Sequence, residues 1–209
     1  MYGFVLLVVR LAMRIAFNLH YEGKENIPKG ENFIYASNHR TNADPPLVGA
    51  GILGKHSFMA KEELFHNKLF AWLIRSLGAF PVARGKGDTG VIDTSIKCLE
   101  EGRNLMIFPE GTRSKTGKVG RGHSGAALIS AKSGKRIIPV GVIFGEKLKF
   151  RTRITVKYGK PIDPAEYIDD PTDPNPRQLV KLKNRYMDEI KALVGEVQPE
   201  SGSKEAENE

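Results

Sequence analysis

Short apolar runs alternate along this chain with longer segments of helical periodicity, and few architectures other than a layered α/β domain accommodate that order. The chain has 209 residues, enough for one sizeable domain. Strands are predicted over residues 32–37, 56–60, 104–108, 137–144 and 153–157. Helices are predicted over residues 45–53, 62–77, from an N-cap at Asp88 to just before Gly102, over 125–132, and in a final segment that ends near Val194. We therefore expect a single α/β domain with a mostly parallel or mixed sheet flanked by helices.

An amphipathic helix is predicted for residues 1–20, ahead of the main domain at residues 21–196. Its apolar surface is interrupted only by Arg10, Arg14 and Asn18, whose spacing of four places them on one helical face. The apolar run before Arg10 is too short to span a bilayer. We expect this helix to lie at a membrane interface, and packing against the domain core is the alternative. Residues 197–209 carry four Glu and one Lys, which predicts a disordered acidic tail.

The net charge of +8 indicates an anionic partner for the body of the chain, although an ordinary basic surface would give the same value. Aromatic residues do not interleave with the basic ones, so nucleic acid is not an expected partner. The single cysteine, Cys98, excludes an internal disulfide framework and a cysteine-based metal cluster. The five histidines lack metal-ligand spacing, so no metal site and no cofactor is predicted.

A histidine and an aspartate, His39 and Asp44, lie in a short loop between a predicted strand and a predicted helix. If the loop curls, the carboxylate accepts the Nδ1 hydrogen and leaves Nε2 to take a proton from a substrate hydroxyl. The alternative is structural. Asp44 precedes Pro45-Pro46 and has the features of a helix N-cap, which would leave His39 as an ordinary loop residue.

A second loop, residues 108–114, leaves a buried strand at a proline and turns at Gly111. A tight turn that offers a backbone amide, the Thr112 hydroxyl and Arg113 suits a phosphate group, because arginine grips phosphate oxygens in a bidentate way. Glu110 cannot bind phosphate itself, but it can orient Arg113 or hold the turn. The alternative is a turn stabilised by a Glu–Arg pair with no ligand.

Two further segments are weaker on their own. Residues 78–84 contain a helix terminus, a short extended piece and Arg84, which on a surface is usually only solvated. Residues 137–142 have the composition of a core strand around Pro139.

Together these segments resemble the glycerolipid acyltransferase family, typified by 1-acyl-glycerol-3-phosphate acyltransferases. Four blocks occur in the family's order: Asn38-His39 through Asp44-Pro45, Gly78-Ala79-Phe80-Pro81-Val82-Ala83-Arg84, Phe108-Pro109-Glu110-Gly111-Thr112-Arg113-Ser114, and Ile138-Pro139-Val140. Thr41 stands where the family usually has serine, which keeps a hydroxyl at that position.

The resemblance implies an α/β fold and direct acyl transfer without a covalent acyl-enzyme. It assigns the general base to His39 and its orientation to Asp44. It assigns the phosphate of the acceptor to Arg84, Glu110, Gly111, Thr112 and Arg113, and places Pro139 on the acyl-donor side.

The implied reaction moves a fatty acyl group from a thioester of coenzyme A or acyl carrier protein to the sn-2 hydroxyl of lysophosphatidic acid. The product is phosphatidic acid, a precursor in phospholipid biosynthesis. The expected location is peripheral, on the cytoplasmic face of an anionic membrane. Acylation of glycerol-3-phosphate or another lysophospholipid, and a catalytically silent lipid-binding protein at the membrane surface, remain as alternatives.

Overall fold

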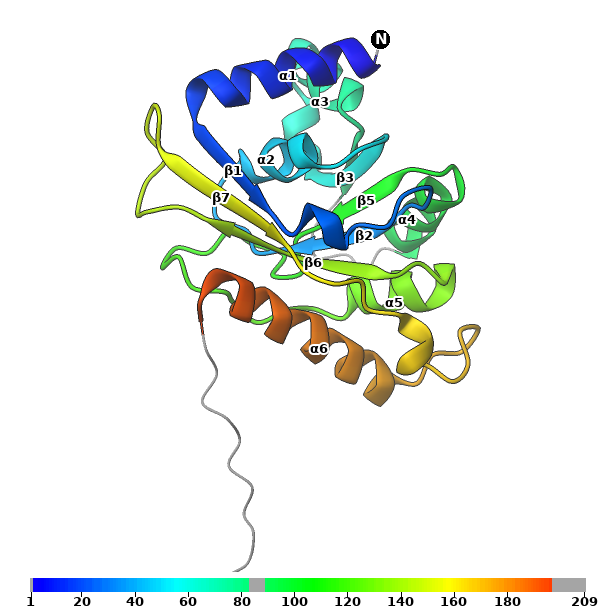
Figure 1. The fold of residues 1–209 in the computed structure, drawn as a ribbon. Helices are drawn as coiled ribbons and strands as arrows, with labels where there is room; N and C mark the ends of the chain where they lie inside the picture. The colour runs from blue at the N-terminus through cyan, green and yellow to red at the C-terminus, as the bar shows by residue number, and fades with distance from the viewer. Residues whose placement is uncertain (1, 83–88, 197–209) are drawn as a thin grey trace, which may run out of the picture.

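The computed structural model describes residues 2–82 and 89–196, and in that part of the chain seven strands form one sheet (Figure 1). The strands are β1 (Asn18–Glu22), β2 (Ile34–Ser37), β3 (His56–Lys61), β4 (Ala79–Val82), β5 (Asn104–Ile107), β6 (Ile137–Ile143) and β7 (Arg153–Tyr158). Their order across the sheet is β1-β7-β6-β2-β5-β3-β4. Every neighbouring pair is parallel except β6 and β7, which are antiparallel. The predicted class, an α/β domain with a mostly parallel, mixed sheet, is confirmed.

Helices cover both faces of this sheet. They are α1 (Tyr2–Ala16), α2 (Asp44–Gly51), α3 (Lys68–Ser76), α4 (Thr89–Glu100), α5 (Gly125–Ser133) and α6 (Pro176–Val194), with short 3-10 turns η1 (Lys24–Asn26), η2 (Glu62–Phe65) and η3 (Pro164–Glu166). Helices α1 and α2 lie over one face, and α5 and α6 lie under the other (Figure 1). Among the described residues, no helix combines the length and the apolar content that crossing a bilayer requires.

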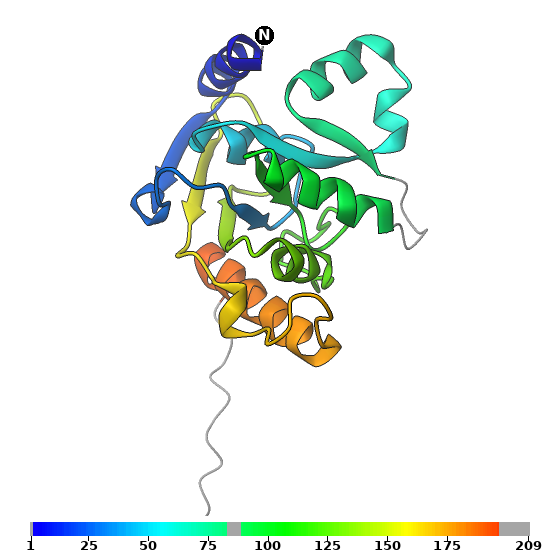
Figure 2. The same ribbon diagram turned by 90° about the vertical axis from the view of Figure 1, so that its right-hand side faces the viewer.

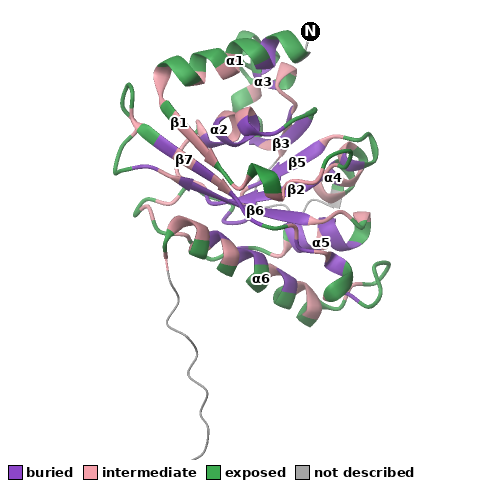
Figure 3. Cartoon of the chain, viewed as in Figure 1, coloured by how far each residue is buried: buried purple, intermediate pink, exposed green. Residues whose placement is uncertain are grey.

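The sheet separates two hydrophobic cores, because successive side chains of a strand point to opposite faces. In β2, Tyr35 packs into the core beneath α2, whereas Ile34 and Ala36 pack into the core shared with α5 and α6. Both faces are therefore buried, and the central strands read as continuous apolar runs rather than as alternating ones (Figure 3).

Two neighbouring strands end at the same edge of the sheet, and this edge positions the site. β2 and β5 are parallel, with Ala36 opposite Ile107. The loop after β2 and the loop after β5 therefore begin side by side. In open α/β sheets, ligands bind at the carboxyl ends of such strands.

The predicted bounds of the N-terminal helix were wrong. Helix α1 ends at Ala16, and Asn18 opens β1, which pairs with β7 at the edge of the sheet. In β1 the side chains of Leu19 and Tyr21 pack against the core. Two inward-facing residues are too few for the sequence to distinguish a strand from the end of the helix. Of the two arginines on this helix, Arg10 faces the protein body and its guanidinium donates to the Ile52 carbonyl at 2.6 Å, whereas Arg14 is exposed.

The helix predicted over residues 62–77 is divided into η2 and α3. The break falls at Asn67, whose side chain accepts a hydrogen bond from the Phe70 backbone amide at 3.0 Å and starts a new helix. The predicted N-cap Asp88 lies outside the described residues. Gly102 follows α4 with a φ of 75°, the left-handed conformation expected of a glycine that ends a helix.

Candidate active site

The loop after β2 brings His39 and Asp44 together. The Nδ1 atom of His39 lies 2.8 Å from Oδ2 of Asp44. The aspartate side chain is fully buried, whereas 13% of the histidine side chain is exposed. The curled loop that the sequence interpretation required is therefore present, and it leaves part of the imidazole accessible.

Four donors converge on the Asp44 carboxylate. Besides His39, Oδ2 accepts the backbone N–H groups of Arg40 at 2.6 Å and Thr41 at 2.8 Å, and Oδ1 accepts the Thr41 hydroxyl at 2.8 Å. The N-cap position of α2 belongs to Ala43, and Asp44 is the first helical residue. The alternative in which Asp44 serves as the helix N-cap is therefore wrong, because its carboxylate turns back to the loop that carries His39.

This arrangement assigns the tautomer of His39. An ionised carboxylate only accepts hydrogen bonds, so Nδ1 carries the hydrogen and Nε2 keeps its lone pair. The ring also stacks on Phe108, with 4.2 Å between ring centroids and 25° between planes. The imidazole is thus fixed in plane and in tautomer, which is what proton abstraction by Nε2 needs.

Glu110 joins the two loops at this edge. Its side chain is almost fully buried, and its two carboxylate oxygens accept the backbone N–H groups of His39 and Gly120, each at 2.8 Å. A third bond runs the other way, from the Ser114 N–H to the His39 carbonyl at 2.7 Å. The loop after β5 is therefore attached to the backbone of His39 itself.

Gly111, Thr112 and Arg113 lie on the exposed side of that second loop. Gly111 adopts a φ of 67°, which favours glycine, and its N–H donates to the Phe108 carbonyl at 3.0 Å. Within residues 2–82 and 89–196, the Arg113 guanidinium has no ion-pair partner, so it is accessible to an anion. Arg84, the other predicted phosphate ligand, lies outside the described residues.

Pro139 lies inside the sheet rather than on a loop. It is buried in β6 opposite Ala36 of β2, and its carbonyl accepts the Gly159 N–H at 2.9 Å. The structure therefore places Pro139 on the strand next to β2, the strand from which the His39 loop begins.

Two residues that position the loop received no role from the sequence. The Asn38 side chain accepts the Val142 N–H at 2.7 Å and donates to the Val142 carbonyl at 3.0 Å, so it pairs with β6 as another strand would. Arg40 donates to the carbonyls of Phe144 at 2.6 Å and Gly145 at 2.9 Å, and lies 3.9 Å from the centre of the Phe144 ring. The only local signal for either residue is that it adjoins His39.

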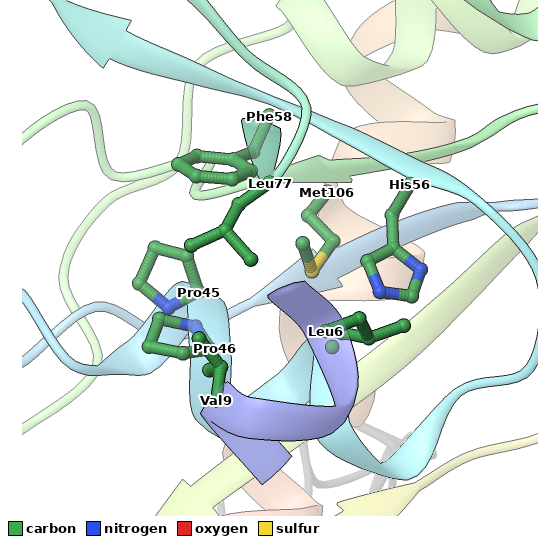
Figure 4. A pocket seen from close by; sticks show the side chains of 9 residues that line it. Leu6, Val9, Pro45, Pro46, His56, Phe58, Leu77 and Met106 are labelled. Carbon is green, nitrogen blue, oxygen red and sulfur yellow. The ribbon is translucent and has the colours of Figure 1, made fainter. Parts of the chain in front are cut away.

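A narrow apolar pocket lies behind the same loop (Figure 4). It has a volume of about 20 Å³ and is enclosed by α1, α2 and β3, with a lining of Leu6, Val9, Pro45, Pro46, Gly49, His56, Phe58, Leu77 and Met106. Burial lowers the pKa of His56 to about 4, and the positive charge of Arg10 adds to the effect. Among the described residues, no group of three or more His, Cys, Asp or Glu side chains is arranged to hold a metal ion.

Comparisons with known proteins place this chain in one family. A family model described as Acyltransferase matches residues 18–143. The 1-acyl-sn-glycerol-3-phosphate acyltransferase of Streptococcus pneumoniae is 36% identical over 90% of this chain and 70% of its own length. The enzyme of the same name from Bacillus subtilis is 30% identical over 91% and 96%. The crystal structure of the corresponding acyltransferase PlsC from Thermotoga maritima superposes with a TM-score of 0.72 at 25% identity, over 94% of this chain and 82% of that one.

Proposed function

This chain belongs to the acyltransferase family that includes the 1-acyl-sn-glycerol-3-phosphate acyltransferases, and from that premise we propose that it acylates the sn-2 hydroxyl of 1-acyl-sn-glycerol-3-phosphate. The product is phosphatidic acid, and the donor is an acyl thioester of coenzyme A or acyl carrier protein. One observation carries the assignment of the base: the Asp44 carboxylate fixes Nδ1 of His39 and leaves Nε2 as the only ring atom free to accept a proton.

In this mechanism, Nε2 of His39 takes the proton of the sn-2 hydroxyl as its oxygen attacks the thioester carbonyl. A carbon–oxygen bond forms, and the tetrahedral intermediate collapses by breaking the carbon–sulfur bond. The departing thiolate receives the proton back from Nε2, so the histidine ends as it began. Asp44 stabilises the imidazolium that exists between these steps. A thioester is already activated, so the enzyme needs no nucleophile of its own.

The phosphate of the acceptor anchors the glycerol near the base. We assign this anchoring to the exposed Arg113, with the Gly111–Thr112 turn beside it and Arg84 as a second cation. Glu110 acts indirectly, because its bonds to the His39 and Gly120 amides hold the loop that carries Arg113 against the loop that carries the base. Holding a substrate in reactive geometry can lower the activation barrier by up to about 7–11 kcal/mol.

Contact with a membrane is assigned to two helices at one end of the molecule. Helix α1 buries Val5 and Leu6 against the body and exposes a row of apolar side chains, namely Phe4, Leu7, Val8, Leu11 and Ile15. An apolar helical surface of this kind inserts into the headgroup region of a bilayer. One side of the helix packs on the domain, as the alternative interpretation expected, and we assign the exposed side to lipid.

Helix α3 offers a second apolar surface at the same end (Figures 1 and 2). It exposes Leu69, Phe70, Trp72 and Leu73, and the exposed cations Lys68 and Arg75 flank them. Tryptophan beside apolar and basic side chains suits the boundary between headgroups and acyl chains. We therefore propose peripheral binding to the anionic cytoplasmic face of a membrane through α1 and α3.

The test is acyl transfer to 1-acyl-sn-glycerol-3-phosphate in detergent micelles, with wild type beside His39→Ala. Wild type is expected to form phosphatidic acid with at least one of the two donors. His39→Ala is expected to lose roughly 10²–10⁴-fold in kcat while it still unfolds in a cooperative thermal transition. A folded His39→Ala variant with wild-type turnover would remove His39 from the mechanism.

The same assay separates the alternatives. If wild type prefers glycerol-3-phosphate or another lysophospholipid, the proposed acceptor is wrong, but the assignment of His39 as the base stands. Failure of wild type with both donors and every acceptor would favour the catalytically silent lipid-binding protein, which the built His39–Asp44 pair argues against.

A further inference from the structure

A wide polar cleft lies beside the catalytic loop, and neither the base nor the proposed phosphate ligands account for it. Its volume is about 880 Å³, which falls within the range of small-molecule sites. Three segments line it: residues 40–41 after the base, residues 114–117 in the loop after β5, and residues 144–148 between β6 and β7. Arg113 is not part of this lining.

The cleft shares its walls with the active site. Thr41 and Arg40 lie in the cleft and donate their backbone N–H groups to Asp44. Ser114, on the opposite wall, donates its N–H to the carbonyl of His39 at 2.7 Å. The cleft lining therefore includes the residue that follows the base in the chain and a residue hydrogen-bonded to the backbone of the base.

The shape of the cleft is fixed by Arg40. Its guanidinium is bound to the carbonyls of Phe144 and Gly145 and lies against the Phe144 ring, so it holds the β6–β7 connection in place. Gly117 adopts a φ of 82°, and a Cβ there would come within 3.2 Å of Nη2 of Arg40. The glycine thus lets the opposite loop approach the arginine closely.

The remaining side chains suit an anion. Lys115 and Lys147 project from opposite walls and are exposed, and neither has an ion-pair partner within the described residues. Ser114 and Thr116, whose hydroxyl oxygens are 3.5 Å apart, belong to the same lining, and Glu146 is its single acidic residue. Two free cations with hydroxyl groups close by form a phosphate-binding surface of the non-bidentate kind that lysine provides.

The reaction has a second substrate whose polar half has no assigned place. Coenzyme A and acyl carrier protein both present their acyl group on a phosphopantetheine arm, a long polar chain that ends in phosphate. We propose that this cleft binds the phosphate-bearing carrier of the acyl thioester, with Lys115 and Lys147 contacting its phosphates and the arm directed toward His39. The inference rests on the proposed acyltransferase function and adds the donor half of the site.

The experiment measures KM for each substrate separately in detergent micelles. The variant is Lys115→Ala/Lys147→Ala, and the matched control is Lys132→Ala/Lys160→Ala, which removes the same charge from exposed positions outside the cleft. The cleft variant is expected to raise KM for acyl-coenzyme A roughly tenfold, with kcat at saturating donor and KM for the acceptor within twofold of wild type. The control is expected to match wild type, and both variants to keep wild-type thermal unfolding.

A second donor distinguishes the two carriers. If KM rises equally for acyl-coenzyme A and for the acyl carrier protein thioester, the lysines contact the phosphate common to both. If it rises for acyl-coenzyme A alone, they contact the phosphates of the nucleotide portion. Either result supports the inference.

An unchanged KM for the donor would overturn the inference and show that the cleft is only a solvent groove. A rise in KM for the acceptor instead would overturn it by showing that the cleft is an acceptor site. An inactive wild type would contradict the proposed acyltransferase function itself, which is a different outcome from an active enzyme with an unmoved donor KM.

Discussion

Two regions of this molecule each enclose a histidine, and their surroundings act in opposite ways on a positive charge at the ring. At the strand-end edge, His39 meets a buried carboxylate that accepts three further hydrogen bonds. In the pocket beneath α1, His56 is surrounded by Leu6, Val9 and other apolar groups, and its pKa falls to about 4.

The difference lies in what each surrounding does to a positive charge on the ring. In the proposed mechanism, Asp44 stabilises the imidazolium that His39 forms between the two proton transfers. Burial and the charge of Arg10 penalise the same species at His56, so that ring stays neutral in the folded protein at ordinary pH. The proposed mechanism therefore uses a histidine that faces a carboxylate, whereas the second histidine is buried beside apolar groups and kept neutral.

The largest effect that tests this contrast is expected from Asp44→Asn. An amide can keep its oxygen where the two backbone N–H groups and the His39 ring donate and turn its N–H₂ group toward the Thr41 hydroxyl, but it removes the negative charge that stabilises the His39 imidazolium. We expect kcat to fall roughly 10²–10³-fold and the free energy of unfolding to fall by about 1–3 kcal/mol. Kinetics and urea denaturation measure the two losses. Thr41→Ser, which keeps the hydroxyl, serves as the control. Near-normal turnover in Asp44→Asn would show that the Asp44 carboxylate does not assist His39.

The second effect concerns stability rather than turnover. Unfolded His56 titrates near 6.5, and the folded pKa is about 4, so between these values the unfolded chain binds more protons. The stabilisation is complete above pH 6.5 and is lost as pH falls toward 4, by about 3 kcal/mol in all, since one pKa unit corresponds to about 1.4 kcal/mol.

The measurement is the free energy of unfolding against pH for wild type and His56→Gln. The glutamine variant does not titrate, so its curve is expected to be flatter in that interval. At pH 7.5 it is also expected to keep acyl transfer within a few-fold of wild type. Parallel pH curves for the two proteins would show that His56 does not titrate as its burial implies.

The third effect returns to the strand-end edge. Arg113→Ala is expected to raise KM for 1-acyl-sn-glycerol-3-phosphate roughly thirtyfold and to change kcat little, because charge-assisted bonds to phosphate are worth about 1.5–3 kcal/mol. Arg113→Lys, which keeps the charge but not the fork, is expected to recover part of the loss. Equal losses in kcat and kcat/KM would instead place Arg113 at the reacting atoms.

The sequence predicted the loop that carries His39 and the strand that carries His56, but not the pocket around His56. His39 and Asp44 lie in one short loop, so their contact required only that the loop curl. The central strands were predictable because they are continuous apolar runs. The partners of Asn38 and Arg40 were not predictable, because Val142 and Phe144 are more than a hundred residues away and are defined only once β2 and β6 pair.

The errors have the same origin. Strand β1 is short, lies at an edge and gains its structure from pairing with β7, so its alternation was absorbed into the preceding helix. The break before α3 depends on a single cap at Asn67 in a segment that is otherwise uniformly helical in periodicity. In both places a tertiary or capping contact decided between conformations that the local pattern leaves nearly equal.

The smallest effect is expected at the apolar end, from Leu69→Ser/Trp72→Ser on α3. Both side chains are exposed, so the variant should fold as wild type, and its activity in detergent micelles should be unchanged. Binding to vesicles that contain an anionic phospholipid is expected to weaken roughly fivefold, since part of the apolar surface that inserts at the interface is removed. Val180→Ser, an exposed apolar position on α6, is the matched control and should bind as wild type. If the α3 variant also binds as wild type, the membrane contact belongs to α1 alone, and the apolar surface of α3 needs another explanation.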